Sequence, residues 1–367
     1  GIYHSQNTWL PHSQYYDSHP EYFALIDGQR SSDPECKLCN SNPDVAVEIA
    51  LNMKQYLDSN PSVELISLSP TDGQRWCECD DCKALDEDGV PNDQKYSRRQ
   101  MVLYNRVAAE LEKYYPDKKI LAGSYNVYTW PPADPDMEAH PNLSVVICHY
   151  DPYCLAHPVN DPTCTDNQVY NDIISAWQAL GCDIYFYEYY RKTSWLDLPW
   201  PVVHTMKEDI PYFYSIGAKG LYTGHNLQDM WSTLPNHYIA ARLLWDHTAD
   251  VNALLDDFYD KFYADASVPM RAYHEALEQQ MANSSHHIGG YAQGNAKHIF
   301  TRELFEQLNS YLDQAWALEP DGKAGQRVDR QVQIMEYGRR LMKFLWLRDR
   351  ADDATGAQRC SLLKLAL

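Results

Sequence analysis

The chain has 367 residues, of which 44% are hydrophobic, so it is long enough to bury the core of one large domain or of two ordinary ones. Its 51 acidic residues outnumber its 31 basic residues and give a formal net charge of -20. Such a surface repels phosphate backbones and anionic lipid headgroups, and no apolar run approaches the ~20 residues of a membrane span. We therefore expect no nucleic-acid partner and no membrane span.

Segments typical of helices and strands alternate over the first two thirds of the chain. Residues 42–59 begin with Asn-Pro, which suits a helix N-cap and first helical position, and continue with apolar residues at helical spacing. Residues 64–69 form a short apolar run that ends at Pro70 and an Asp-Gly turn. The later predicted strands are 119–125, 144–150, 183–189 and 219–224, and the later predicted helices are 96–115, 166–180, 203–216 and 235–245.

Apolar strands that alternate with helices indicate a parallel sheet covered on both faces, in a barrel or in a doubly wound sheet. The polar residues at the strand ends, and the lack of a Gly-rich phosphate turn in the sequence, favour a (β/α)8 barrel of the TIM type. A weak candidate at residues 1–6 brings the strands only to six, so we expect the chain to lack the barrel's first strands. We predict a barrel catalytic domain at 1–248 and, from the 3.6-residue period, a helical C-terminal subdomain at 249–367.

Ten cysteines are present, and five of them lie in the runs CKLC (36–39) and CECDDC (77–82). Cysteine pairs roughly forty residues apart can supply four thiolates to zinc, whereas an exported protein oxidises such residues to disulfides, and buried unpaired thiols are a third alternative. The acidic residues between the last cysteines would add repulsion to an anionic metal site, so disulfides are favoured. Cys154 and Cys164, which flank a polar loop, are further loop cysteines of this kind. We expect no metal and no cofactor, and a secreted, periplasmic or cell-surface protein.

The aromatic composition is unusual, with 28 Tyr and 10 Trp against only 8 Phe. Amphipathic rings suit a surface that stacks on a ligand and hydrogen-bonds it, and sugars have apolar faces and hydroxyl rims. The composition therefore leans towards a carbohydrate ligand, with an ordinary Tyr-rich surface as the alternative.

Two carboxylates at predicted strand ends are candidates for catalysis. Asp72 follows a strand that Pro70 stops, and Glu188 lies within the aromatic run FYEYY (186–190), where loss of solvation suits a general acid. Glycoside hydrolysis needs two such groups beside the scissile bond. The alternatives are a turn Asp that hydrogen-bonds its own backbone and an outward Glu paired with Arg191 or Lys192.

The other candidates are polar or aromatic residues at or after the ends of the predicted strands, which could bind a sugar. For the pair His149 and Asp151, at the end of strand 144–150, a solvated loop is an equal alternative. For each tryptophan taken singly, ordinary packing is the favoured role. The predicted substrate-binding residues are Tyr125, Trp130, His149, Asp151, Tyr187, Tyr189, His225, Asn226 and Trp231.

Several longer motifs resemble a known family. They are HPEYFALIDGQR (19–30), LCNSNP (38–43), SLSPTDG (67–73) with WCEC (76–79) and, later, LLWD (243–246). Together they resemble an exported bacterial family, long catalogued as uncharacterised domain family 4838, that now contains the glycoside hydrolases of family 163. The resemblance covers roughly residues 1–275.

The resemblance implies a barrel related to those of hexosaminidases and α-glucuronidases, and endo-β-N-acetylglucosaminidase action on N-glycans of a glycoprotein substrate. It further implies retention of configuration, assisted by the 2-acetamido group of the substrate. One carboxylate orients the acetamide, and a second residue acts as acid and then as base. We assign Asp72 and Glu188 to this pair and Tyr187 or Tyr189 as donors to the acetamide. The related barrels carry an adjacent acidic pair, whereas here Gly73 follows Asp72.

Two other functions remain open. An exo-acting α-glucuronidase or hexosaminidase-like glycosidase would use the related barrel, with Arg75 or Arg191 for a uronate. A non-catalytic carbohydrate-binding barrel would bind sugar without turnover. A serine hydrolase is disfavoured because the sequence contains no G-x-S-x-G motif.

Overall fold

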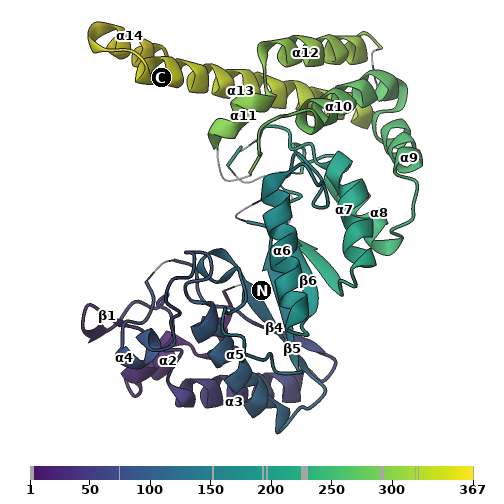
Figure 1. Cartoon of the computed structure of the whole chain (residues 1–367). Helices are drawn as coiled ribbons and strands as arrows, with labels where there is room; N and C mark the ends of the chain where they lie inside the picture. Colours follow the sequence, from purple (N-terminus) through teal and green to yellow (C-terminus); the bar gives the residue numbers. More distant parts are fainter. Residues whose placement is uncertain are drawn as a thin grey trace. The chain divides into compact units, whose positions relative to one another are not determined.

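The computed structural model divides the chain into two compact units (Figure 1). The first comprises residues 1–151, 171–187 and 218–222, and the second comprises residues 152–170, 188–217 and 223–367. The residues that the structure describes are 4–73, 75–150, 153–191, 194–195, 197–224, 230–289, 293–318, 320 and 322–366.

A five-stranded sheet, in the order β3-β4-β5-β6-β7, forms the core of the first unit. The strands are β3 (Leu65–Leu68), β4 (Lys119–Ser124), β5 (Leu143–Cys148), β6 (Asp183–Glu188) and β7 (Gly220–Thr223). The pairs from β3 to β6 are parallel, with Ile66 opposite Ile120 and Val146 opposite Tyr185. Every residue of β5 is buried, as expected for a central parallel strand with both faces covered. The strands predicted from residue 64 onward are thus confirmed, with small shifts at their ends.

The prediction of a closed (β/α)8 barrel is wrong. In the described part of the chain β3 and β7 are the two edges of the sheet, so it is an open half-barrel. Closure of this barrel type needs eight tilted strands, and the twist accumulated by five strands does not bring the edges together. The weak candidate strand at residues 1–6 does not contribute, because the described residues His4 and Ser5 are not in a strand and helix α1 begins at Gln6.

The longer helices of the first unit follow the sequence prediction closely. Helix α3 begins at Pro43, and the side chain of its N-cap Asn42 accepts a hydrogen bond from the Asp44 amide. It packs on α5, which also contacts β4 and β5. The elements of this unit outside the sheet are α1 (Gln6–Trp9), α2 (His12–Tyr15), η1 (Pro20–Tyr22), β1 (Leu25–Ile26), β2 (Gln29–Arg30), α3 (Pro43–Ser59), α4 (Asp80–Lys83), α5 (Ser97–Glu112) and η2 (Asn126–Tyr128); α6 (Thr165–Ala179) contains residues of both units.

The second unit is helical and contains all of residues 249–367, which confirms the predicted helical C-terminal region. Helix α10 packs on α12, α12 on α13, and α13 on α14 (Figure 1). Side chains of Asp250 and Thr301 cap the first turns of α9 and α12. The elements are α7 (Val203–Ser215), α8 (Asn236–Trp245), α9 (Val251–Tyr263), η4 (Ala264–Ala266), α10 (Ser267–Ala282), η5 (Gln293–Asn295), α11 (Ala296–Ile299), α12 (Arg302–Ala317), α13 (Gly322–Asp352) and α14 (Gly356–Ala366).

Among the described helices, none has the combination of length and apolar character that crossing a bilayer requires. Many of the tyrosines are core residues, among them Tyr104, Tyr170, Tyr263 and Tyr273. The tyrosine content therefore reflects core packing to a large extent, whereas both interpretations of the composition had placed the tyrosines on the surface.

Candidate functional site

Most of the predicted residues of the first unit lie at the C-terminal ends of the strands of the sheet. Tyr125 follows β4, His149 and Tyr150 follow β5, and Tyr187 lies near the end of β6. The rings of Tyr125 and Tyr150 are 4.8 Å apart, and those of Tyr187 and Tyr222 are 5.1 Å apart. The His149 side chain is buried, and its amide donates to the Tyr187 carbonyl at 3.1 Å. The structure therefore places Tyr125, His149 and Tyr187 at the C-terminal ends of three neighbouring strands.

Asp72 occupies the turn that follows β3. The amide of Ser69 donates to the hydroxyl of Ser5 at 3.0 Å, which ties the end of the strand to the N-terminal segment. Asp72 is exposed and accepts a hydrogen bond from the Gly73 amide at 2.9 Å. Gly73 has a φ of 92°, which favours glycine. The Asp72 side chain therefore accepts a hydrogen bond within its own turn, and its carboxylate is exposed beyond the C-terminal end of β3.

A buried lysine lies beside this turn. Lys37 is only 3% exposed, and its ammonium donates to the Thr71 carbonyl at 2.5 Å. The same nitrogen lies 4.6 Å from the centre of the Trp76 ring, which gives a cation–π contact. Burial lowers the pKa of Lys37 to about 8, and the charge of Asp72 partly opposes that shift. Lys37 was not predicted from the sequence, because the run CKLC was considered only for its cysteines.

Two further aromatic rings pack against Trp76, the ring that contacts the lysine. Trp76 stacks on Tyr96 with ring centres 4.5 Å apart and meets Tyr128 edge to face at 5.7 Å. Burial raises the pKa of Tyr128 well above its usual range. Among the described residues, the buried indole N–H of Trp76 and the buried hydroxyl of Thr71 have no hydrogen-bond partner. Orphaned polar groups of this kind are costly to bury.

Glu188 belongs to the second unit and lies in a buried acidic setting. It is the last residue of β6, and its side chain is 1% exposed. Burial raises the pKa of Asp209, a residue of α7, well above its usual range, and the charge of Glu188 adds to that shift. The pKa of Tyr190 is raised by the same two causes. Asp209, whose carboxylate accepts from the Val159 amide at 2.6 Å, was missed because it lies within a helix rather than at a strand end.

The other predicted residues of the described chain have packing contacts. Tyr189 is buried, and its carbonyl accepts from the Trp200 indole at 2.8 Å. Trp231 is half-buried, with its ring 6.2 Å from Phe262. The Trp130 indole donates to the Asp93 carboxylate at 3.0 Å. Tyr189 and Trp231 belong to the second unit and Trp130 to the first. The predicted residues Asp151, His225 and Asn226 lie outside the described residues.

One arginine considered for a uronate is already paired. The Arg75 guanidinium lies 2.6 Å from the Asp27 carboxylate, and both side chains are exposed. The two catalytic candidates, Asp72 and Glu188, fall in the first and second units respectively.

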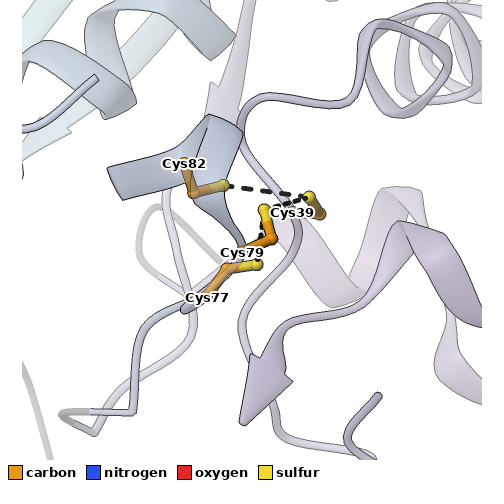
Figure 2. Close-up of side chains that lie close together, drawn as sticks. All are labelled: Cys39, Cys77, Cys79 and Cys82. Carbon is orange, nitrogen blue, oxygen red and sulfur yellow. Dashed lines mark hydrogen bonds between the residues drawn. The ribbon is translucent and has the colours of Figure 1, made fainter. Parts of the chain in front are cut away.

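All ten cysteines are free thiols in this structure, so the expected disulfides do not form. Instead, two sets of side chains bring their sulfur and nitrogen atoms within 4.8 Å of one another. The first set lies in the first unit and is shown in Figure 2, where Cys39 faces a loop and short helix that carry the other three. Either set could hold a metal ion. The sets are Cys39, Cys77, Cys79 and Cys82, and Cys154, His157, Cys164 and His287.

About three quarters of the chain matches one protein family. Residues 1–275 match the sequence model of a family described as "Domain of unknown function (DUF4838)". No curated protein matches the chain. The family description states no activity, so any function must be argued from the residues themselves.

Proposed function

The chain belongs to the DUF4838 family, and from that premise and its motifs we propose that it is a retaining glycoside hydrolase. The proposed activity is endo-β-N-acetylglucosaminidase cleavage of N-glycans on glycoproteins. The resemblance of the SPTDG and WCEC motifs to glycoside hydrolases of family 163 supports this choice. Because the proposed substrates are extracellular glycoproteins, the proposal places the protein outside the cell, at the cell surface or in the periplasm.

One observation carries the proposal: carboxylates follow or end two strands of a parallel sheet. Asp72 follows β3 and Glu188 ends β6, and the aromatic residues Tyr125, Tyr150 and Tyr187 follow or lie near the ends of β4 to β6. Strand ends of this kind hold the catalytic groups in α/β enzymes, and tyrosines there can stack on a sugar and hydrogen-bond its rim.

The proposed reaction needs two carboxyl groups, and Asp72 and Glu188 are the candidates for these two roles. One carboxyl group protonates the leaving oxygen as the bond from this oxygen to the anomeric carbon breaks. The acetamide oxygen of the substrate forms the new bond to that carbon and gives a cyclic oxazolinium, whose N–H the second carboxylate orients. Water then attacks the anomeric carbon and loses its proton to the first group, which restores both the acetamide and the enzyme.

The decisive experiment is incubation of the protein with a glycoprotein that carries complex N-glycans, followed by mass spectrometry of the products. Released glycans that end in one reducing N-acetylglucosamine, with the second left on the protein, support the proposal. Release of single monosaccharides points instead to an exo-acting glycosidase. Binding to the glycoprotein without release points to a non-catalytic carbohydrate-binding protein. Either of the last two results would refute the endo-acting function.

Variants test the two carboxylates. Asp72→Asn and Glu188→Gln should each lower turnover by about 10²-fold or more while the unfolding temperature changes little, because the shapes are kept. Asp117→Asn, in an exposed turn before β4, and Glu208→Gln, exposed on α7, are matched controls that should keep full activity. Full activity in Asp72→Asn or in Glu188→Gln would remove that residue from the mechanism.

A further inference from the structure

Four cysteines of the first unit are spaced as ligands of one tetrahedral ion. Four thiolates at about 2.3 Å from zinc lie about 3.8 Å from one another, because the edge of a tetrahedron is about 1.63 times the centre-to-corner distance. The Cys39 sulfur lies 3.7 Å from that of Cys79 and 3.8 Å from that of Cys82, and the Cys77 and Cys79 sulfurs are 3.4 Å apart (Figure 2). A disulfide bond is only about 2.05 Å long. We infer that Cys39, Cys77, Cys79 and Cys82 bind one zinc ion.

The surroundings suit a tetrathiolate site, which carries a net charge of about -2 when zinc is bound. The Leu25 amide lies 3.3 Å from the Cys77 sulfur, and the Ser41 hydroxyl lies 3.1 Å from the Cys82 sulfur. The guanidinium of Arg30 is 3.9 Å from the Cys77 sulfur. Donors of this kind stabilise thiolates and orient them towards the metal.

A second cation is held beside the site. The Arg99 side chain is 1% exposed and donates to the Cys77 carbonyl at 2.9 Å. The acidic side chains that argued against a metal, Glu78, Asp80 and Asp81, are all exposed to solvent. The repulsion expected from the sequence is therefore largely screened by solvent.

The zinc would be structural. Four protein ligands leave no position open for water or substrate. The ion would join the segment after the first hairpin, which contains Cys39, to the segment that follows the Asp72 turn. Short elements hold this region, because β1, β2 and α4 contain at most four residues each. The inference does not depend on the proposed glycosidase function.

An independent set of side chains in the second unit has the same character. The Cys154 sulfur lies 3.3 Å from His157 Nδ1, and the Cys164 sulfur lies 3.5 Å from His287 Nδ1. Zinc bound to sulfur at about 2.3 Å and to nitrogen at about 2.0–2.1 Å puts these atoms about 3.5 Å apart. The structure assigns a second zinc ion, with two thiolates and two imidazoles, to Cys154, His157, Cys164 and His287.

Hydrogen bonds of the Nε2 atoms of both histidines, and of the loop that contains Cys154, support this assignment. His157 Nε2 lies 3.0 Å from the Ser284 carbonyl. This carbonyl accepts a hydrogen bond from the Nε2–H group, so the unprotonated Nδ1 can bind the metal. His287 Nε2 lies 3.3 Å from the Thr165 hydroxyl. The buried amide of Asn167 accepts from the Cys154 amide and donates to the carbonyls of Cys154 and His157, so the loop is held in place without the ion. Neither histidine was considered as a metal ligand from the sequence, although the C-x-x-H spacing of 154–157 was a usable signal.

The test is the metal content of the full chain, purified without chelators and measured by elemental analysis and native mass spectrometry. We expect about two zinc ions per chain, one for each site. Cys82→Ala and Cys154→Ala should each remove one ion and leave the other. Cys182→Ala, at a buried cysteine outside both sets, and Cys360→Ala, at an exposed one, should keep both ions.

Cobalt exchange keeps the inference testable if an alanine variant fails to fold. Cobalt at the first site should give thiolate-to-metal charge transfer together with tetrahedral d–d bands. Cys79→His, at the most exposed of its four ligands, should retain the ion and shift those bands to shorter wavelength. A metal-free chain whose mass shows disulfides at these cysteines, or one whose ten thiols all react with no metal bound, would overturn both assignments. Iron in place of zinc at the first site would overturn that one.

Discussion

The buried ammonium of Lys37 makes a specific prediction about how stability depends on pH. The folded protein holds the Lys37 proton only up to a pKa of about 8, whereas the ordinary value, to which the unfolded chain returns, is 10.5. Between these pH values the unfolded state binds more protons than the folded state. The free energy of unfolding therefore rises with pH in this window.

The size of the effect follows from the same two values. Each pH unit between about 8 and 10.5 is worth about 1.4 kcal/mol, so the folded first unit should gain about 3 kcal/mol across the window. Lys37 is 3% exposed, so solvent screens this contribution little. Lys37→Met keeps the length and apolar stem of the side chain but has no proton to lose, so it should not show this gain. Loss of the hydrogen bond to the Thr71 carbonyl shifts its stability by an offset that does not vary with pH.

The assay is denaturant unfolding of wild type and Lys37→Met at several values from pH 7 to 10.5, followed by circular dichroism. Cysteines and tyrosines titrate in both proteins, so their contributions cancel in the difference. Lys83→Met, which removes an exposed lysine, should follow the wild type at every pH. Parallel curves for wild type and Lys37→Met would refute the reasoning, as would a 13Cε shift of Lys37 that titrates near 10.5 rather than 8.

Three further predictions concern buried groups. Burial raises the pKa of Asp209, so the free energy of unfolding falls as pH rises above about 4. Asp209→Asn, which still accepts a hydrogen bond from the Val159 amide, should therefore have the same denaturant midpoint as wild type at pH 4 and a higher midpoint at pH 8. Burial lowers the pKa of His274 to about 3, so the free energy of unfolding should drop by several kcal/mol from pH 6.5 to 3, and His274→Gln should lose less over that range in acid unfolding curves. Arg99→Met should destabilise by roughly 3 kcal/mol, because it leaves the Asp86 carboxylate unpaired; a thermal midpoint equal to wild type would contradict this.

Most secondary structure could be predicted because its signals are local. Helix α3 starts with Asn-Pro. The Asn side chain caps the first turn, and Pro lacks an amide donor at a position where the helix uses none, so both signals are visible in the sequence. The strands from β3 to β7 are short apolar runs bounded by turn residues, so their positions also follow from the chain itself. Asp72 was found in the same way, because Pro70 and Gly73 mark the end of β3.

The candidate residues that were missed depend on contacts between distant segments. Lys37 lies beside Asp72 only because the chain folds back over the end of β3, and no local pattern marks a lysine as buried. Asp209 accepts a hydrogen bond from the Val159 amide, which lies fifty residues away in the sequence. His287 comes within 3.5 Å of Cys164 across an even longer stretch of chain.

The sequence by itself determined approximately where the longer helices and the strands from β3 to β7 lie, because period, caps and turn residues act over a few neighbouring positions. Only the tertiary structure decided whether the sheet closes, because closure depends on how many strands pair and how far their twist accumulates. It also decided the arrangement of the cysteines. Spacing along the chain allowed disulfides or a metal, and the distances among Cys39, Cys79 and Cys82 favour the metal because they match a shared ion and not a covalent pair.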